Sequence, residues 1–189
     1  VFAPSESAAT PFRKHFDLQN IEVKSHPDAS KKSSTLESKS PKMLIGQDGI
    51  IRIAVIGAIG ESKGFSLLQD CIVDADLREL PLLYQIIGYT QDDETLLAHE
   101  NVQISGRYQH EQGPEVIRQS GAGIALFLSP WPETWSYTLT EALEEGLYPV
   151  SLDIGAIAER MRGMDIGEIL PRHSEAFEIN NALLALAHE

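Results

Sequence analysis

Apolar and polar positions alternate in blocks from Ile51 to the end of the chain. Runs of β-branched and other apolar residues, typical of strands buried on both faces, occupy 51–57, 81–88, 101–105, 122–129, 148–153 and 167–171. Segments with helical spacing or helix-start residues lie between and after them, at 63–77, 92–98, 113–119, 136–146, 155–163 and 174–188. This alternation predicts an α/β fold, a doubly wound parallel Rossmann-like sheet of about six strands.

The first fifty residues follow a different pattern. Residues 25–50 are rich in Ser, Lys, Pro and Gly and have no helical or strand period, which predicts a linker. Residues 1–24 precede it as a short appendage, and 51–189 form the main domain. The chain begins abruptly with VFAPSES, the end of a strand followed by a cap, so we expect a fragment of a longer protein.

Charge and composition narrow the class of function. The chain has 15 basic and 28 acidic residues, a net charge of −13, which argues against binding nucleic acid or an anionic membrane. Its one cysteine, Cys71, has no internal disulfide partner and lies on the apolar face of its predicted helix, so we expect it in the core. No apolar run reaches the roughly 18 residues of a membrane span. These features predict a soluble, cytoplasmic protein.

The loop after the first strand of the domain, GAIGESKG at 57–64, is a candidate phosphate site. Its glycines Gly57, Gly60 and Gly64 allow a close approach of the backbone to a ligand. Lys63 is expected to begin the next helix, where the amides and the dipole favour an anion. The loop lacks the spacing of a Walker motif and of a dinucleotide fingerprint, so a tight turn with a surface lysine is an equal alternative.

The segment 129–146, SPWPETWSYTLTEALEEG, is the most informative. Ser136 is the predicted N-cap of a helix, Glu133 lies just before it, and Glu141 lies one and a half turns along it. The free amides at 136–138 then face a ligand with a carboxylate one turn deeper, an arrangement that suits a phosphate linked to a hydroxyl-rich group. The alternative is that Glu133 only favours the helix dipole and Glu141 belongs to a solvated face.

Taken in order, these loops resemble the nucleotide-sugar-binding, C-terminal half of a GT-B glycosyltransferase. The group in question is the large retaining one (group 1, or family 4-like) that includes many bacterial polysaccharide enzymes. The resemblance rests on Glu133, seven residues, Glu141; on Lys63-Gly64; and on DIGAIAE at 153–159, a strand end followed by a helix. Residues 1–24 are similar to the tail of the acceptor-side domain, so the rest of that domain is an implied partner.

The resemblance implies a role for each matched position. Glu141 would accept hydrogen bonds from the ribose hydroxyls, and Glu133 would contact hydroxyls of the donor sugar. Lys63 would pair with the diphosphate. Glu133 and Lys63 are therefore the candidate catalytic residues. The full set of implied donor-binding residues is Gly57, Gly60, Lys63, Gly64, Tyr89, Gly106, Tyr108, Glu133, Ser136, Tyr137, Thr138 and Glu141.

The resemblance also implies the reaction. A sugar would move from a nucleoside-diphosphate sugar to a saccharide or lipid-linked acceptor, with retention at the anomeric carbon. Lys63 and a helix N-terminus can stabilise the departing diphosphate, so no metal or other cofactor is expected. The isolated fragment is expected to be inactive, and any membrane association would come through the rest of the parent protein.

One departure from the family pattern keeps alternatives open. The family loop carries an arginine where this chain has Ala58. A second charge then comes from elsewhere, such as the missing domain or Arg107, or else the donor site is weakened. A non-catalytic nucleotide-sugar-binding or scaffolding module is therefore a second hypothesis, and a flavodoxin-like or epimerase-like nucleotide sheet is a third. Trp131 and Trp135 either shape the sugar pocket or pack the loop, and His26 and His110 are expected in surface or capping roles.

Overall fold

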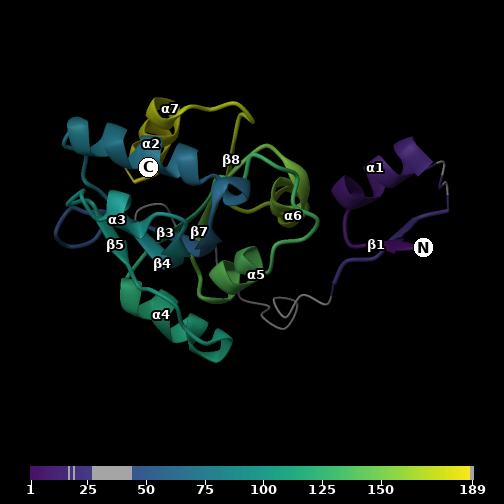
Figure 1. Ribbon diagram of the computed structural model, residues 1–189, viewed down its shortest axis with the longest axis horizontal. Coiled ribbons are helices and arrows are strands. Elements are labelled where there is room, and N and C mark those ends of the chain that lie inside the picture. Colours follow the sequence, from purple (N-terminus) through teal and green to yellow (C-terminus); the bar gives the residue numbers. More distant parts are fainter. Residues whose placement is uncertain (17, 19, 27–43, 188–189) are drawn as a thin grey trace.

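The computed structural model describes residues 1–16, 18, 20–26 and 44–187, and most of the expected 25–50 linker lies outside this part of the chain. The main domain is a six-stranded parallel sheet with helices on both faces (Figure 1). Its strands are β3 (Ile51–Ile59), β4 (Leu82–Thr90), β5 (Val102–Ile104), β6 (Ile124–Phe127), β7 (Tyr148–Leu152) and β8 (Glu168–Leu170). The α/β prediction is confirmed.

The strand order is β5-β4-β3-β6-β7-β8. This is the order of dinucleotide-binding sheets, and it differs from the flavodoxin-like order in which the first strand lies second from an edge. The flavodoxin-like alternative is therefore wrong. The order reverses between β3 and β6, the position at which such sheets bind ligands beyond the carboxyl ends of their strands.

The connecting segments supply the two outer layers. Helices α2 and α7 lie together against one face of the sheet, and α4 and α5 lie on the other side (Figure 1). The connecting elements are η3 (Glu61–Lys63), α2 (Phe65–Leu77), α3 (Asp93–Leu96), η4 (His110–Gln112), α4 (Gly113–Ser120), α5 (Tyr137–Glu144), α6 (Gly155–Met164) and α7 (Ala176–Leu186). Of the helices in the described residues, none has the length and apolar character needed to cross a bilayer.

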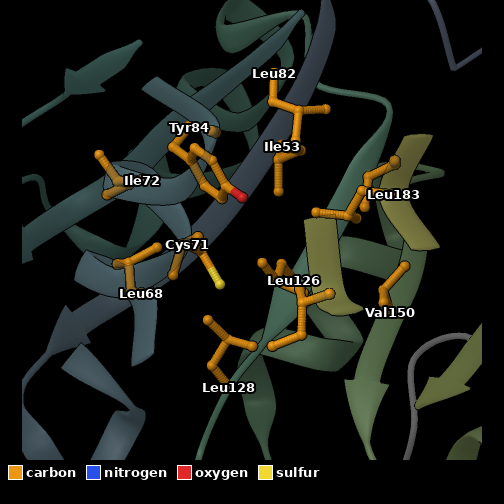
Figure 2. Packing of buried hydrophobic residues seen from close by; sticks show 14 of the residues in the cluster. Ile53, Leu68, Cys71, Ile72, Leu82, Tyr84, Leu126, Leu128, Val150 and Leu183 are labelled. Atoms are coloured by element: carbon orange, nitrogen blue, oxygen red, sulfur yellow. The ribbon is translucent and has the colours of Figure 1, made fainter. Parts of the chain in front are cut away.

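The larger core lies between the sheet and the α2–α7 layer. Figure 2 shows Leu68, Cys71 and Ile72 of α2 packed with side chains from the strands and from α7. Cys71 is fully buried, as expected, and burial raises the pKa of its thiol to about 12, which makes it unreactive near neutral pH. The hydroxyl of Tyr84 lies inside this core and is bonded to Asn180 of α7, so this buried polar group has its partner.

The N-terminal residues form a separate small unit that lies beside α6. The strands β1 (Phe2–Ala3) and β2 (Glu22–Val23) pair in parallel, joined by α1 (Glu6–Phe16). Figure 1 shows α1 and β1 away from the main sheet, on the side of α6. A strand, a helix and a strand thus precede the undescribed segment. Residue Leu44, which follows the undescribed segment, already packs in the main core.

Candidate functional site

The first loop of the site is shorter than the sequence indicated. Gly57, Ala58 and Ile59 continue β3, because they pair with Gly88–Thr90 of β4. The sequence predicted that Lys63 begins the next helix, but this was wrong. Lys63 ends the 3-10 turn η3, and α2 starts at Phe65. The prediction failed because the glycines of 57–64 indicated a loop, whereas the segment contains the last residues of β3 and the turn η3.

Gly64 makes the contact between this turn and the neighbouring strand possible. It has a φ of 85°, and a β-carbon on it would lie 2.1 Å from the carbonyl oxygen of Leu128, just beyond β6. Only glycine fits such a position without displacing the backbone. The two loops at the reversal of the sheet order therefore touch directly.

Further hydrogen bonds fix the segment between β6 and α5. The Ser129 hydroxyl donates to the carbonyl of Ser62, 2.9 Å away in η3. On the opposite side, the amide of Ala156 in α6 donates to the carbonyl of Glu133 at 2.9 Å. The segment that carries Glu133 is thus held from both sides.

The two candidate catalytic side chains meet at this point. The Lys63 ammonium lies 2.7 Å from Oε1 of Glu133, and the lysine side chain is 40% exposed against 17% for the glutamate. Both line a cavity of about 20 Å³ together with Thr138 of α5. That volume is close to the space of one water molecule.

Helix α5 begins beside this pair. Ser136 is its N-cap, as expected, with its hydroxyl accepting a hydrogen bond from the amide of Leu139 at 3.4 Å. The φ of Ser136 is 78°, an uncommon value for a residue other than glycine and one that proteins retain at functional turns. The first-turn amides of Tyr137 and Thr138 have no partner within the helix, which makes this end a candidate anion site.

Glu141 lies further along α5 and is half-buried. Burial raises its pKa above the ordinary glutamate value, and the charge of Glu144 adds to the effect, although His110 acts in the opposite direction. Nδ1 of His110 lies 3.5 Å from Oε1 of Glu141. The His110 side chain is exposed, as expected. It also faces the Glu141 carboxylate, which the sequence did not indicate.

A cavity of about 340 Å³ opens next to these residues. It is lined by Gly57, Ala58, Gly88, Tyr89, Arg107, Tyr108 and Gln109. The Arg107 guanidinium stacks on the Tyr89 ring, 3.8 Å from its centroid. Burial raises the pKa of Tyr108, and the negative charge of Glu141 adds to the effect.

The cavity has the character of a site for a flat, polar ring. It offers two aromatic side chains and a guanidinium, together with glycine backbone that a ligand can approach closely. Arg107 and Ala58 line the same space, so the arginine lies in the region where the family loop would place its own.

The remaining predicted residues lie around rather than in these cavities. Gly60 is the N-cap residue before η3, Gly106 adopts a φ of 77° ahead of the cavity wall, and Tyr137 is exposed at the start of α5. Trp131 is exposed, whereas Trp135 is buried. Over the described residues, no three His, Cys, Asp or Glu side chains gather into a group that could hold a metal.

Two contacts made by α6 near the candidate site were not predicted from the sequence. Arg160 binds the carbonyls that lead into α5, and Glu159 binds the first amides of α1. Glu159 belongs to the DIGAIAE segment, which the resemblance matched without giving this residue a role. Arg160 carried no signal, since a basic residue on a helix is usually solvated.

Comparisons with known proteins give the fold a family context. No family model and no curated protein sequence matches the chain. Among solved structures, it overlays the lipopolysaccharide outer core galactosyltransferase WaaB (apo form) with a TM-score of 0.72 at 18% identity, over 99% of this chain and 52% of WaaB. It overlays Anabaena Alr3699/HepE in complex with UDP and glucose with a TM-score of 0.68 at 16% identity, covering 98% and 52%.

A third structure, TarM, overlays with a TM-score of 0.70 at 14% identity, over all of this chain and 36% of TarM. The chain thus spans between about a third and a half of the proteins that it matches. It has the fold of half of a GT-B glycosyltransferase, so the resemblance seen in the sequence is confirmed at the level of the fold.

Proposed function

We propose that this chain is the donor-binding part of a glycosyltransferase that uses a nucleoside-diphosphate sugar. The observation that carries the proposal is the order of groups across the reversal of the sheet. The Lys63–Glu133 pair and the start of α5 lie at one end, Glu141 follows, and the cavity with Tyr89 and Tyr108 lies at the other. Phosphate, ribose and base need groups of these kinds in this order.

The diphosphate would lie at Lys63 and at the first-turn amides of α5. A leaving nucleoside diphosphate gains negative charge, and a lysine with preorganised amides stabilises that charge without a metal. Thr138 lines the small cavity with Lys63 and also lies near Gly57, from which the larger cavity begins. The two cavities are therefore close enough for one ligand to reach both.

The ribose and the base would follow along the same surface. Glu141 is half-buried at the surface of α5, beside His110, and its carboxylate can accept hydrogen bonds from the two ribose hydroxyls. The base would enter the 340 Å³ cavity against Tyr89 and Arg107. The structure of HepE was solved with UDP and glucose, so uridine nucleotides are the first candidates for this chain.

The acceptor side would come largely from elsewhere in the parent protein. The unit formed by β1, α1 and β2 would be the tail of the acceptor-side domain, and the acceptor a saccharide or lipid-linked saccharide. Transfer with retention is part of the same proposal. We propose a cytoplasmic enzyme.

The test of donor use separates the nucleotide from the sugar. In equilibrium dialysis, the chain is expected to bind UDP-glucose, and UDP should compete for the same site. Free glucose should not bind. The chain is also expected to transfer no sugar to added saccharides, because it spans only about half of the length of WaaB and HepE. Binding of free glucose without any competition by UDP would contradict the proposal.

A non-catalytic binding or scaffolding module is a second candidate, and two observations favour it. Ala58 leaves the larger cavity without the arginine of the family loop, and Lys63 is paired with Glu133. This candidate predicts that the full-length parent binds a nucleotide sugar but releases no nucleoside diphosphate from it, whereas a transferase releases one for each sugar moved.

A further inference from the structure

Arg160 lies beneath the turn that leads into α5. It projects from the middle of α6 and is only 9% exposed, which is rare for arginine. Its guanidinium donates to the carbonyl of Ser136 at 2.6 Å and to that of Trp135 at 3.4 Å. A third bond reaches the hydroxyl of Thr140 at 2.8 Å. The Arg160 side chain thus binds the backbone just before the first turn of α5 and a side chain within the helix.

The guanidinium also packs on an aromatic ring. Its central carbon lies 4.0 Å from the centroid of the buried Trp135 ring. A stacked guanidinium with several fixed bonds is a rigid support, since its planar fork loses little freedom when it binds. Arg160 therefore fixes both the backbone and the side chain of the residue before the N-cap.

The turn that it supports is in an unfavourable conformation. Ser136 has a φ of 78° although it carries a side chain, and such a residue persists only when its surroundings hold it. The direction of its carbonyl, which Arg160 binds, is set by the same peptide plane that carries the amide of Tyr137. Holding the carbonyl thus orients a first-turn amide of α5.

The same helix connects this turn to the N-terminal unit. Both oxygens of Glu159, the residue before Arg160, accept hydrogen bonds at 2.9 Å from the amides of Glu6 and Ser7, which begin α1. The hydroxyl of Ser5 donates to the carbonyl of Thr134 at 2.9 Å. Helix α6 therefore touches the candidate acceptor side and the candidate donor side through consecutive residues.

We propose that Arg160 is a positioning residue of the donor site, which holds the Trp135 and Ser136 carbonyls so that the first-turn amides of α5 face the diphosphate. This inference rests on the proposed function. In this inference the buried Arg160 side chain touches no atom of the donor. It orients the first-turn amides of α5, which do touch the donor. Diphosphate affinity then depends on Arg160, whereas affinity for the nucleoside portion does not.

The test compares Arg160→Met with Arg160→Lys and with Arg162→Met as the matched control. Arg162 lies on the same helix and loses the same charge, but its side chain pairs with Asp153 at the surface. Calorimetric titrations with UDP, UMP and uridine give the affinities, and thermal melting followed by circular dichroism shows that each variant is folded.

We expect Arg160→Met to lose about tenfold or more in affinity for UDP and less than about twofold for uridine, the scale of one lost charge-assisted hydrogen bond. Arg160→Lys should recover part of the UDP loss, and Arg162→Met should change none of the affinities more than about twofold. If Arg160→Met does not fold, Arg160→Lys provides the test. The ratio of its affinity for UDP to its affinity for uridine should be lower than that of the unmodified chain.

Two results would overturn the inference. One is a folded variant at Arg160 whose UDP affinity equals that of the unmodified chain. The other is an equal loss for UDP and uridine, because a general loosening of the fold affects both. Failure of the unmodified chain to bind any of the three, or any other nucleoside diphosphate, is distinct, since it overturns the proposed function itself and this inference with it.

Discussion

The ammonium of Lys63 lies 2.7 Å from the carboxylate of Glu133, and the two residues come from the loops on opposite sides of the reversal between β3 and β6. In the proposed function they serve different parts of one donor, the diphosphate and the sugar. Their direct pairing therefore implies an exchange of partners when a donor binds. The lysine is 40% exposed, so the exchange is open to an incoming phosphate.

Replacing Glu133 should reveal this exchange. In Glu133→Gln the carboxylate no longer competes for Lys63, so affinity for UDP should rise by a few-fold, on the scale of a partly exposed ion pair. UDP-glucose should gain less, because the sugar loses its own contact with the carboxylate. Calorimetry on both ligands checks this, and lower affinity for UDP would contradict it.

Replacing Lys63 should act on the diphosphate alone. Lys63→Met keeps an unbranched stem and removes the charge, and we expect about a tenfold or greater loss for UDP with uridine unchanged. Lys24→Met, which removes a lysine whose ammonium lies over the ring of Phe2 in the N-terminal unit, is the matched control. An equal loss for UDP and uridine would mean that Lys63 acts on the fold or on the base.

Glu141 should be needed only for ligands with ribose hydroxyls. Glu141→Gln is expected to weaken UDP binding by about 1–3 kcal/mol, the range for a hydrogen bond to a charged group. The variant and the unmodified chain should bind 2′,3′-dideoxy-UDP, which lacks both hydroxyls, with much closer affinities. Glu144→Gln, at an exposed neighbouring position, is the control. A loss of the same size for both ligands would remove Glu141 from the ribose site.

The raised pKa of Glu141 gives a prediction with a defined sign. Burial raises this pKa above the ordinary glutamate value, and a protonated carboxyl cannot accept both ribose hydroxyls. UDP affinity should therefore be highest at neutral pH and should fall as the pH drops through the raised pKa of Glu141. Titrations at a series of decreasing pH values check this, and the Glu141→Gln variant should lack the step.

Gly64 offers a test of the contact between the two loops. Gly64→Ala places a β-carbon 2.1 Å from the Leu128 carbonyl oxygen and adds strain at a φ of 85°, so we expect a loss of about 2–4 kcal/mol in unfolding free energy. Gly163→Ala is the control, because its β-carbon meets nothing within 4 Å and alanine favours the helix. Urea unfolding measures both, and a neutral Gly64→Ala would contradict the contact.

Much of the fold was readable because its strands are buried on both faces. The run from Ile51 to Gly57 predicted β3, and Gly146 correctly marked the end of α5 with its left-handed conformation. The limits of the first loop were not readable, since Gly57–Ile59 are strand residues only because β4 lies beside them. That partnership is a property of the sheet and leaves no local pattern.

The part of the candidate site that lies on residues close together in the sequence could be predicted. The spacing of Glu133, Ser136 and Glu141 located the start of α5 and its carboxylates. Contacts between distant segments were not readable: Lys63 meets Glu133 across 70 residues, and Arg160 meets Ser136 across 24. Arg160 differs from a surface arginine only in its burial, which no sequence pattern on α6 discloses.

The proposed function requires that this chain bind a nucleoside diphosphate between α5 and the Tyr89 cavity. Calorimetric titration with UDP, GDP, ADP and dTDP, each with and without magnesium, tests it most directly. We expect selective binding of one of the four, with an affinity that magnesium does not change. Absence of binding to all four would contradict the proposed function.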